Sequence, residues 1–154
     1  MIDEIVDILE RAKADIQARL AEEGINASGR SSASLRVEAY DGGVRLMYGN
    51  PDTAPFETLE VGRPGGPVPR GFTDILVQWS RDKGIAFDTE RERRSFAYLL
   101  GRRIEREGTL RHHSPVDVYT TIVTDTAEAV KADLKVMVTE LIHEELKKAK
   151  MRVI

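Results

Sequence analysis

A stretch rich in glycine and proline at residues 61–71, Val-Gly-Arg-Pro-Gly-Gly-Pro-Val-Pro-Arg-Gly, constrains the fold more than any other feature of the chain. Its prolines lack an N–H and fix φ, so the stretch cannot form a paired central strand. An amphipathic helical pattern follows at residues 72–83 and ends at Gly84, and a second one ends at Gly108. Two helices with clear ends, preceded by an irregular loop, predict a scaffold that projects this loop.

The composition of the loop is typical of a docking element. Proline reduces the entropy that is lost on ordering, and glycine lets one backbone approach another closely. Arg63 and Arg70 flank the apex, and an arginine can bind a carboxylate through two hydrogen bonds. An ordinary surface connection is the alternative. The predicted interface residues are Arg63, Pro64, Gly65, Gly66, Pro67 and Arg70.

The N-terminal third predicts a helix followed by a hairpin. Apolar residues recur at three- and four-residue steps over residues 2–23, and Gly24 is a suitable helix end because it accepts positive φ. Residues 35–40 and 44–48 alternate as half-buried strands do, around the tight-turn sequence Asp41-Gly42-Gly43. A third strand is predicted at residues 56–61.

The remainder of the chain is predicted to be mostly helical. Thr89 and Glu92 have the spacing of a capping box, which opens the helix that ends at Gly108. Residues 116–124 are rich in β-branched side chains and predict a strand or an extended segment, and the helical period returns from residue 127. The predicted fold class is α+β, a small antiparallel sheet with an N-terminal helix, two central helices and a long C-terminal helix, in a single domain over residues 1–154.

The helical periods also predict which side chains face the core. We expect the two terminal helices to pack against the sheet or against each other. The core positions predicted from the four helices are Ile5, Leu9 and Ile16; Phe72, Ile75, Leu76 and Trp79; Phe96, Leu100 and Ile104; and Leu134, Val138 and Leu141.

The amino-acid composition excludes several classes of protein and of functional site. The chain has no cysteine, so disulfides, thiolate metal sites and a cysteine nucleophile are excluded. It has no apolar run near the roughly 20 residues of a membrane span, and its acidic start lacks the pattern of a signal peptide. We therefore expect a protein made in the cytoplasm, with no membrane partner.

Charge is spread unevenly along the chain, although the net charge is only −3. Residues 1–24 carry three basic and seven acidic side chains, whereas residues 63–111 carry eleven basic and seven acidic ones. Solvated helix faces explain this asymmetry, and so does an acidic surface of one subunit that meets a basic surface of its neighbour.

The residues that could form a catalytic, metal-binding or phosphate-binding motif do not have the spacing that such a motif requires. His112 and His113 lie near Asp117, but neighbours on a strand point to opposite faces and rarely reach one ion. His143-Glu144 begins like a zinc-protease motif, yet residue 147 is lysine. The glycine-rich loop lacks the lysine and spacing of a phosphate-binding loop. We expect no enzyme activity, no catalytic or metal site and no cofactor.

In order and spacing, the chain resembles the tail-completion, or head–tail joining, family of long-tailed bacteriophages. The features that carry the resemblance are the first helix, the Asp41-Gly-Gly43 hairpin, Tyr48…Phe56…Glu60-Val-Gly62 before the loop, Trp79-Ser-Arg-Asp-Lys-Gly84, Phe96-Ala…Ile104-Glu-Arg-Glu-Gly-Thr109 and the long last helix. The family often has an aromatic-rich segment after the Gly-Thr pair, where this chain has Leu110-Arg-His-His-Ser-Pro115.

The resemblance implies a structural virion protein without enzymatic activity. Such proteins form homo-oligomeric rings at the phage neck, between the portal or its adaptors and the tail tube or its terminator, and DNA can pass through the ring. The protein would be made in the host cytoplasm and end in the virion. Two alternatives come from the residues: a small nucleic-acid-binding module that uses the arginine-rich helix at 91–111, and a hydrolytic enzyme that uses His112-His113.

Overall fold

The computed structural model describes residues 2–49 and 58–151, without the side chains of residues 149–151. It is a mostly helical α+β structure, which confirms the predicted fold class. Its elements are α1 (Ile2–Glu22), α2 (Arg30–Ala33), β1 (Arg36–Tyr40), β2 (Gly43–Met47), α3 (Thr58–Val61), α4 (Phe72–Asp82), α5 (Glu90–Glu107), α6 (Leu110–His113) and α7 (Thr120–Met151).

The sheet is one antiparallel hairpin. β1 pairs with β2 in a register that places Arg36 opposite Met47 and Tyr40 opposite Gly43. Asp41 and Gly42 form the connection, and Gly42 has a φ of 112°, which a residue with a side chain rarely adopts. The turn predicted from Asp41-Gly42-Gly43 is confirmed.

The first hydrophobic cluster joins both ends of the chain. It consists of Ile16 and Leu20 from α1, Leu35 before the hairpin and Val118 before α7, which are at most 5% exposed. Partly buried side chains from β2 and α7, among them Leu46 and Ile122, pack against it. As predicted, α1 contacts both α7 and the hairpin.

The second hydrophobic cluster lies between α4 and α5. Leu76 and Val77 of α4 meet Ala97 and Ile104 of α5, and all four are buried. Gly101 lies at the contact between the two helices, where a Cβ would lie 3.4 Å from side-chain atoms of Leu76 and of Phe72, at the edge of ordinary van der Waals contact.

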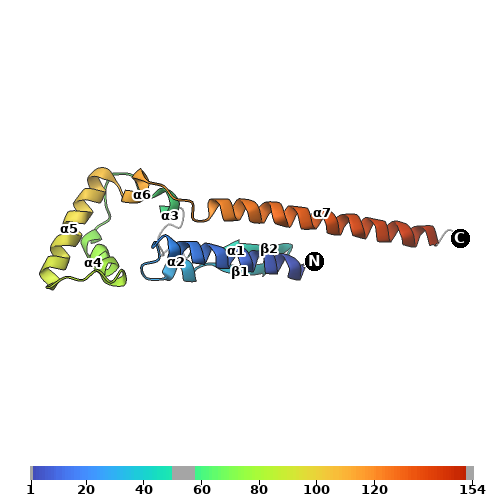
Figure 1. Ribbon diagram of the computed structural model, residues 1–154, viewed down its shortest axis with the longest axis horizontal. Coiled ribbons are helices and arrows are strands. Elements are labelled where there is room, and N and C mark those ends of the chain that lie inside the picture. Colours follow the sequence, from blue (N-terminus) through green and yellow to red (C-terminus); the bar gives the residue numbers. More distant parts are fainter. Residues whose placement is uncertain (1, 50–57, 152–154) are drawn as a thin grey trace.

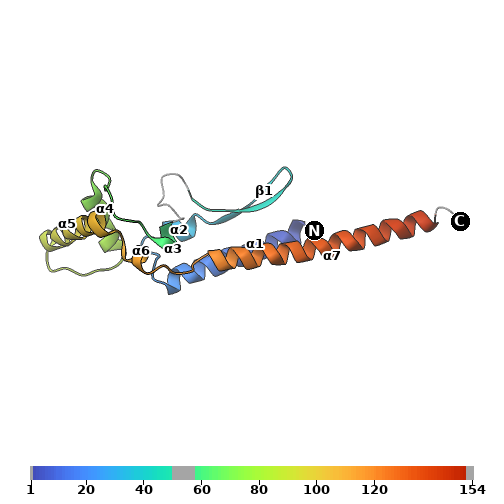
Figure 2. The ribbon, with the colours of Figure 1, turned by 90° about the horizontal axis from the view of Figure 1, so that it is seen from above.

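The molecule is elongated, with the two clusters at different places along its length. In Figure 1, α4 and α5 lie at one end, α1 and the hairpin lie in the middle, and α7 runs out past the N-terminal end of α1. Figure 2 shows the same order from above, with the hairpin standing to one side of α1 and α7. A hydrogen bond from Lys83 Nζ to the carbonyl oxygen of Gly24 links the α4–α5 end to the middle.

Two predicted strands are wrong. Residues 58–61 are helical, as α3, and the rest of the predicted third strand lies outside the described residues. Residues 116–119 have no regular structure, and α7 begins at Thr120, well before residue 127. The β-branched residues at 120–124 entered a helix because their propensity is weak and tertiary contacts at the start of α7 outweigh it.

The buried faces differ in detail from the predicted ones. Ile75 is 54% exposed, and Val77 and Ser80 are buried instead. On α5, Ala97, Gly101 and Ile104 are buried, whereas Phe96, Leu100 and the α4 residue Trp79 are partly buried. On the terminal helices, Ile8 and Ile16 are buried, and Ile5, Leu9 and Leu134 are partly buried. Val138 and Leu141 are each 50% exposed, and the outer part of α7 runs past the N-terminal end of α1 (Figure 1).

Candidate interaction surfaces

The first half of the 61–71 loop lies against the end of α5. The amide of Gly66 donates to the carbonyl oxygen of Glu105 (2.8 Å), and the amide of Thr109 donates to that of Arg63 (2.9 Å). The Thr109 hydroxyl in turn accepts from the amide of Arg63 (2.9 Å). These bonds satisfy polar backbone groups on both segments, so the loop and the α5–α6 connection position each other.

Glycines make this contact possible, and Gly62 and Gly108 are the tightest positions. A Cβ added to Gly62 would lie 2.3 Å from the amide nitrogen of His112, and one added to Gly108 would lie 2.5 Å from the carbonyl oxygen of Arg63. Both residues also have positive φ, 66° and 84°. Glycine is required here for conformation and for space, which is the close backbone approach expected of the loop.

The two arginines of the loop have different surroundings. Arg63 folds back, and its Nη2 donates to the carbonyl oxygens of Gly66 (3.3 Å) and Pro67. Arg70, at the far end of the loop, is exposed, and Pro64, Gly65 and Pro67 are exposed as well. The structure therefore gives Arg63 a role inside the loop and leaves Arg70 accessible. The role of these residues in an interface stays a prediction.

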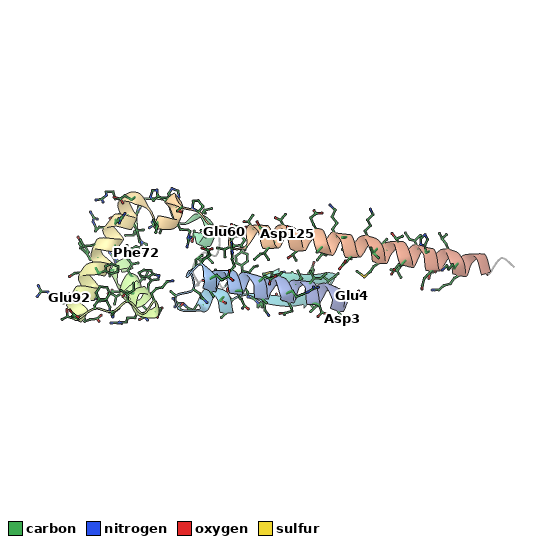
Figure 3. All side chains as sticks on the ribbon, viewed as in Figure 1. Asp3, Glu4, Glu60, Phe72, Glu92 and Asp125 are labelled. Atoms are coloured by element: carbon green, nitrogen blue, oxygen red, sulfur yellow. The ribbon has the colours of Figure 1, made fainter. Side chains whose placement is uncertain are left out.

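Glu60 holds an extensive side-chain network that no local spacing in the sequence predicts. This residue of α3 is 8% exposed. Its Oε1 accepts from the amides of Val118 (2.9 Å), Tyr119 (2.6 Å) and Thr120 (2.8 Å). Its Oε2 accepts from the Thr120 hydroxyl (2.6 Å). Figure 3 shows Glu60 at the point where α7 starts.

Glu60 caps α7 from a distant segment. Burial disfavours its charge and raises its pKa, but the hydrogen bonds from Thr120, Tyr119 and Val118 together lower the pKa below its ordinary value. The carboxylate is therefore charged at neutral pH, where it also complements the positive end of the helix dipole. Its contacts hold α3, and through it the loop, against the start of α7.

The histidine pair lies in the short helix α6 and not in an irregular loop. The rings of His112 and His113 meet edge to face with centroids 5.5 Å apart, and His113 Nε2 lies 2.8 Å from the carbonyl oxygen of Glu107. Asp117 instead accepts from the amide of Thr121 (3.1 Å). Within residues 2–49 and 58–148, no three His, Asp or Glu side chains form a group that could hold a metal ion.

The arginine-rich helix α5 is largely paired with carboxylates. Arg94 pairs with Asp74 of α4 (2.9 Å), and Arg103 pairs with Glu107 (3.0 Å). Arg93 is structural, since its Nη1 donates to Ser80 Oγ (2.9 Å) and to the carbonyl oxygen of Ile85 (3.1 Å). This pairing reduces the positive potential that contact with a phosphate backbone requires.

An apolar groove opens between α1, the hairpin and α7. Its volume is about 560 Å³. The lining comes from α1 (Leu9, Ala12, Ile16), from the hairpin and its flanks (Leu35, Leu46, Tyr48) and from α7 with the residue before it (Tyr119, Val123, Thr126, Ala127, Val130, Lys131, Leu134). A groove of this composition can hold an apolar segment, and it offers few polar groups that could orient a small polar substrate.

The outer half of α7 carries a second apolar surface. Val136, Val138, Leu141, Ile142 and Leu146 are between 50% and 57% exposed. Large contiguous apolar patches are uncommon on soluble monomers outside interfaces. Val138 and Leu141 of this surface were predicted to be core residues. A helical period shows which face of a helix is apolar, but it does not show which element covers that face.

None of the helices among the described residues is long and apolar enough to cross a membrane. A comparison with protein-family models, with curated proteins and with solved structures found no match to this chain.

Proposed function

We propose that this chain is a structural virion protein that forms a homo-oligomeric ring at the neck of a long-tailed bacteriophage. The ring would join the portal or its adaptors to the tail tube or its terminator, with a channel that DNA can cross. The protein would be made in the host cytoplasm and assembled into the virion. The order and spacing of the motifs from the first helix through the Asp41-Gly-Gly43 hairpin to the long last helix support the family part of this proposal.

The structural observation that supports the proposal is the amount of apolar surface that a single copy leaves uncovered. The groove between α1, the hairpin and α7 and the outer half of α7 are both accessible in the monomer. The elongated shape in Figure 1 separates these surfaces from the α4–α5 end, so one copy can contact several neighbours at once. We assign the chain no catalytic step and no cofactor.

The alternative function, nucleic-acid binding, requires the arginines of α5 to contact phosphates. These arginines would have to leave their carboxylate partners, such as Asp74 and Glu107, to reach phosphates. Affinity for DNA would then fall steeply as salt is raised. This dependence gives the alternative its own measurement, separate from assembly.

Complementation tests the proposal directly. A phage from which the gene for this chain is deleted should make separate full heads and tails, and the protein supplied from a plasmid should restore joined particles. Negative-stain images of the restored particles should show added density at the neck, which labelled antibody against this chain should mark. Normal joining without the protein would contradict the proposal, and salt-sensitive binding of the pure protein to DNA would favour the alternative.

A further inference from the structure

The apolar stripe of α7 has the spacing of a helix–helix seam. Its members follow one another at alternating steps of four and three residues: Val123, Ala127, Val130, Leu134, Met137 and Leu141. This alternation keeps a stripe facing one neighbouring helix. The first four members line the groove beside α1.

The seam continues where the first helix does not follow. Figures 1 and 2 both show α7 running past the N-terminal end of α1. Met137 is partly buried, and Leu141 and the flanking Val138 are each 50% exposed. No described element covers this outer half. Because the spacing is that of a coiled-coil seam, the occupant that fits it is another helix.

We propose that the occupant is α7 of a second copy of this chain, packed antiparallel in a two-fold symmetric dimer. The register that centres the pair near residue 139 places Leu141 against the partner's Met137, and by symmetry Met137 against the partner's Leu141. In an antiparallel pair, residues on the same flank of the seam in the two helices face each other. Val138 therefore lies beside the partner's Val138. The centre of the contact is then apolar.

The flanking charges fit this register. Lys131 faces the partner's Glu145, and Asp133 faces the partner's Lys147, and the two-fold axis repeats both pairs. Only Glu140 faces a like charge, the partner's Glu140. In the monomer, Lys131 lies 3.6 Å from Glu128 and Glu145 lies 2.8 Å from Lys148, both in exposed pairs along the helix. Such pairs contribute little, so exchanging them costs little.

A parallel pair does not fit the same charges. In a parallel pair, a residue on one flank of the seam faces the residue five positions further along the partner, on the opposite flank of the seam. Glu140 would then face the partner's Glu145, and the axis would repeat this like-charge contact. The sequence of α7 therefore favours the antiparallel direction.

The groove receives the partner's end of α7 in this arrangement. Ala127, Val130 and Lys131 line the groove, and the antiparallel register lays the last described turns of the partner's helix along them. The chain's own α7 cannot fill the groove, since it is one uninterrupted helix that leaves the groove and runs away from it. The symmetric contact thus covers Met137, Val138 and Leu141 of the outer half and extends along the groove, whereas Val136 stays on the outward side of α7.

This inference does not depend on the phage proposal. A symmetric contact closes at two copies, whereas a ring needs a second, head-to-tail surface. A dimer without a role at the phage neck, and a neck protein that is not a dimer, would be recognised as separate results.

Charge reversal tests the register. The full-length protein should sediment as a dimer that dissociates on dilution. Lys131→Glu and Glu145→Lys should each raise the dimer dissociation constant roughly tenfold, because two attractive pairs become repulsive. An equimolar mixture of the two variants should recover dimers, since every reversed residue then faces an opposite charge. The double variant K131E/E145K should also recover the parent's affinity.

Matched controls separate the register from general effects of charge. Lys135→Glu makes the same charge change one turn along the helix, at a position outside the seam and its flanking residues, and should leave the dissociation constant within about twofold of the parent's. Because the chain has no cysteine, Val138→Cys should form a disulfide-linked dimer on mild oxidation, whereas Val136→Cys should not. A monomer at every concentration, or dimers that tolerate both reversals and show no preference in the mixture, would overturn the proposal.

Discussion

Among single residues, Glu60 accepts hydrogen bonds from amides at the start of a helix, a role that a residue next to the helix has in most helices. Its one carboxylate accepts from Val118, Tyr119 and Thr120 at the start of α7, although 58 or more residues separate them in the chain. The amides at a helix start have no partner within the helix. The distant carboxylate of Glu60 satisfies the Thr120 amide and the two amides just before it, and so holds the start of α7 in its place in the fold.

We expect Glu60→Gln to destabilise the protein by about 1.5–3 kcal/mol at neutral pH, the usual contribution of a hydrogen bond to a charged group. The folded pKa of Glu60 lies below its ordinary value of 4.5, so its contribution to stability is complete above that value and is lost as the pH falls through the folded pKa. Urea unfolding of parent and variant across this range should show a difference that shrinks on acidification. A constant difference would show that the charge of Glu60 does not matter.

The glycines at the loop contact predict a second residue-scale result. Gly108→Ala should cost more than Gly84→Ala, although both positions have positive φ. The alanine Cβ at position 108 would lie 2.5 Å from a backbone oxygen, whereas no atom lies within 4 Å of the one at position 84. We expect a cost of about 1–2 kcal/mol for Gly84→Ala from its left-handed conformation alone, and a clearly larger one for Gly108→Ala. Equal costs in thermal unfolding would argue against the tight contact.

At the scale of elements, the two halves of α7 differ although their apolar stripe is continuous. The first half lies beside α1 and shares the groove with it, and the second half has exposed apolar side chains. We therefore expect substitutions in the first half to change the stability of the monomer and substitutions in the second half to change its association.

Ile16→Ala should destabilise the dilute monomer by about 2–5 kcal/mol, because Ile16 is 1% exposed in the first cluster. Leu141→Ala should change the stability of the dilute monomer by less than about 1 kcal/mol, in the range of surface substitutions. Its effect should appear in sedimentation at high concentration instead, as weaker association. If Leu141→Ala destabilised the monomer as much as Ile16→Ala, the outer half of α7 would be part of the monomer's core.

At the scale of the whole molecule, the loop at 61–71 connects the two ends of the structure. Its first half is bonded to the α5–α6 connection, and α3 just before it holds the start of α7 through Glu60. Deleting residues 63–70 would remove these backbone bonds, so a loss of function in that deletion would not distinguish a lost interface from a disturbed fold.

A point substitution at the exposed end of the loop makes that distinction. Arg70→Glu should leave thermal unfolding of the protein unchanged and should reduce head–tail joining in the complementation assay, because an exposed arginine of a docking loop would lose its carboxylate partner. Arg91→Glu, an equal charge change at an exposed position of α5, should leave joining intact. Normal joining by Arg70→Glu would remove Arg70 from the interface.

Local rules in the sequence were enough for much of the secondary structure. Glycines at positive φ end α1 near Gly24, α4 near Gly84 and α5 at Gly108, and the hairpin turns at Asp41 and Gly42. Thr89 caps α5 through the amide of Glu92 at 3.2 Å. These features depend on a few neighbouring residues, whose conformational preferences are the same in any fold.

Tertiary structure decided what local preferences leave open. The helical state of residues 120–124 accompanies the contact between Glu60 and the start of α7, which sequence spacing does not reveal. The same holds for burial, because periodicity identifies the apolar face of α7 but only the length and position of α1 determine where Leu134 is partly covered and Leu141 is exposed. The ends of α1, α4 and α5 and the hairpin turn follow from neighbouring residues, whereas the helical state of residues 58–61 and 120–124 and the partners of each surface depend on segments far apart in the chain.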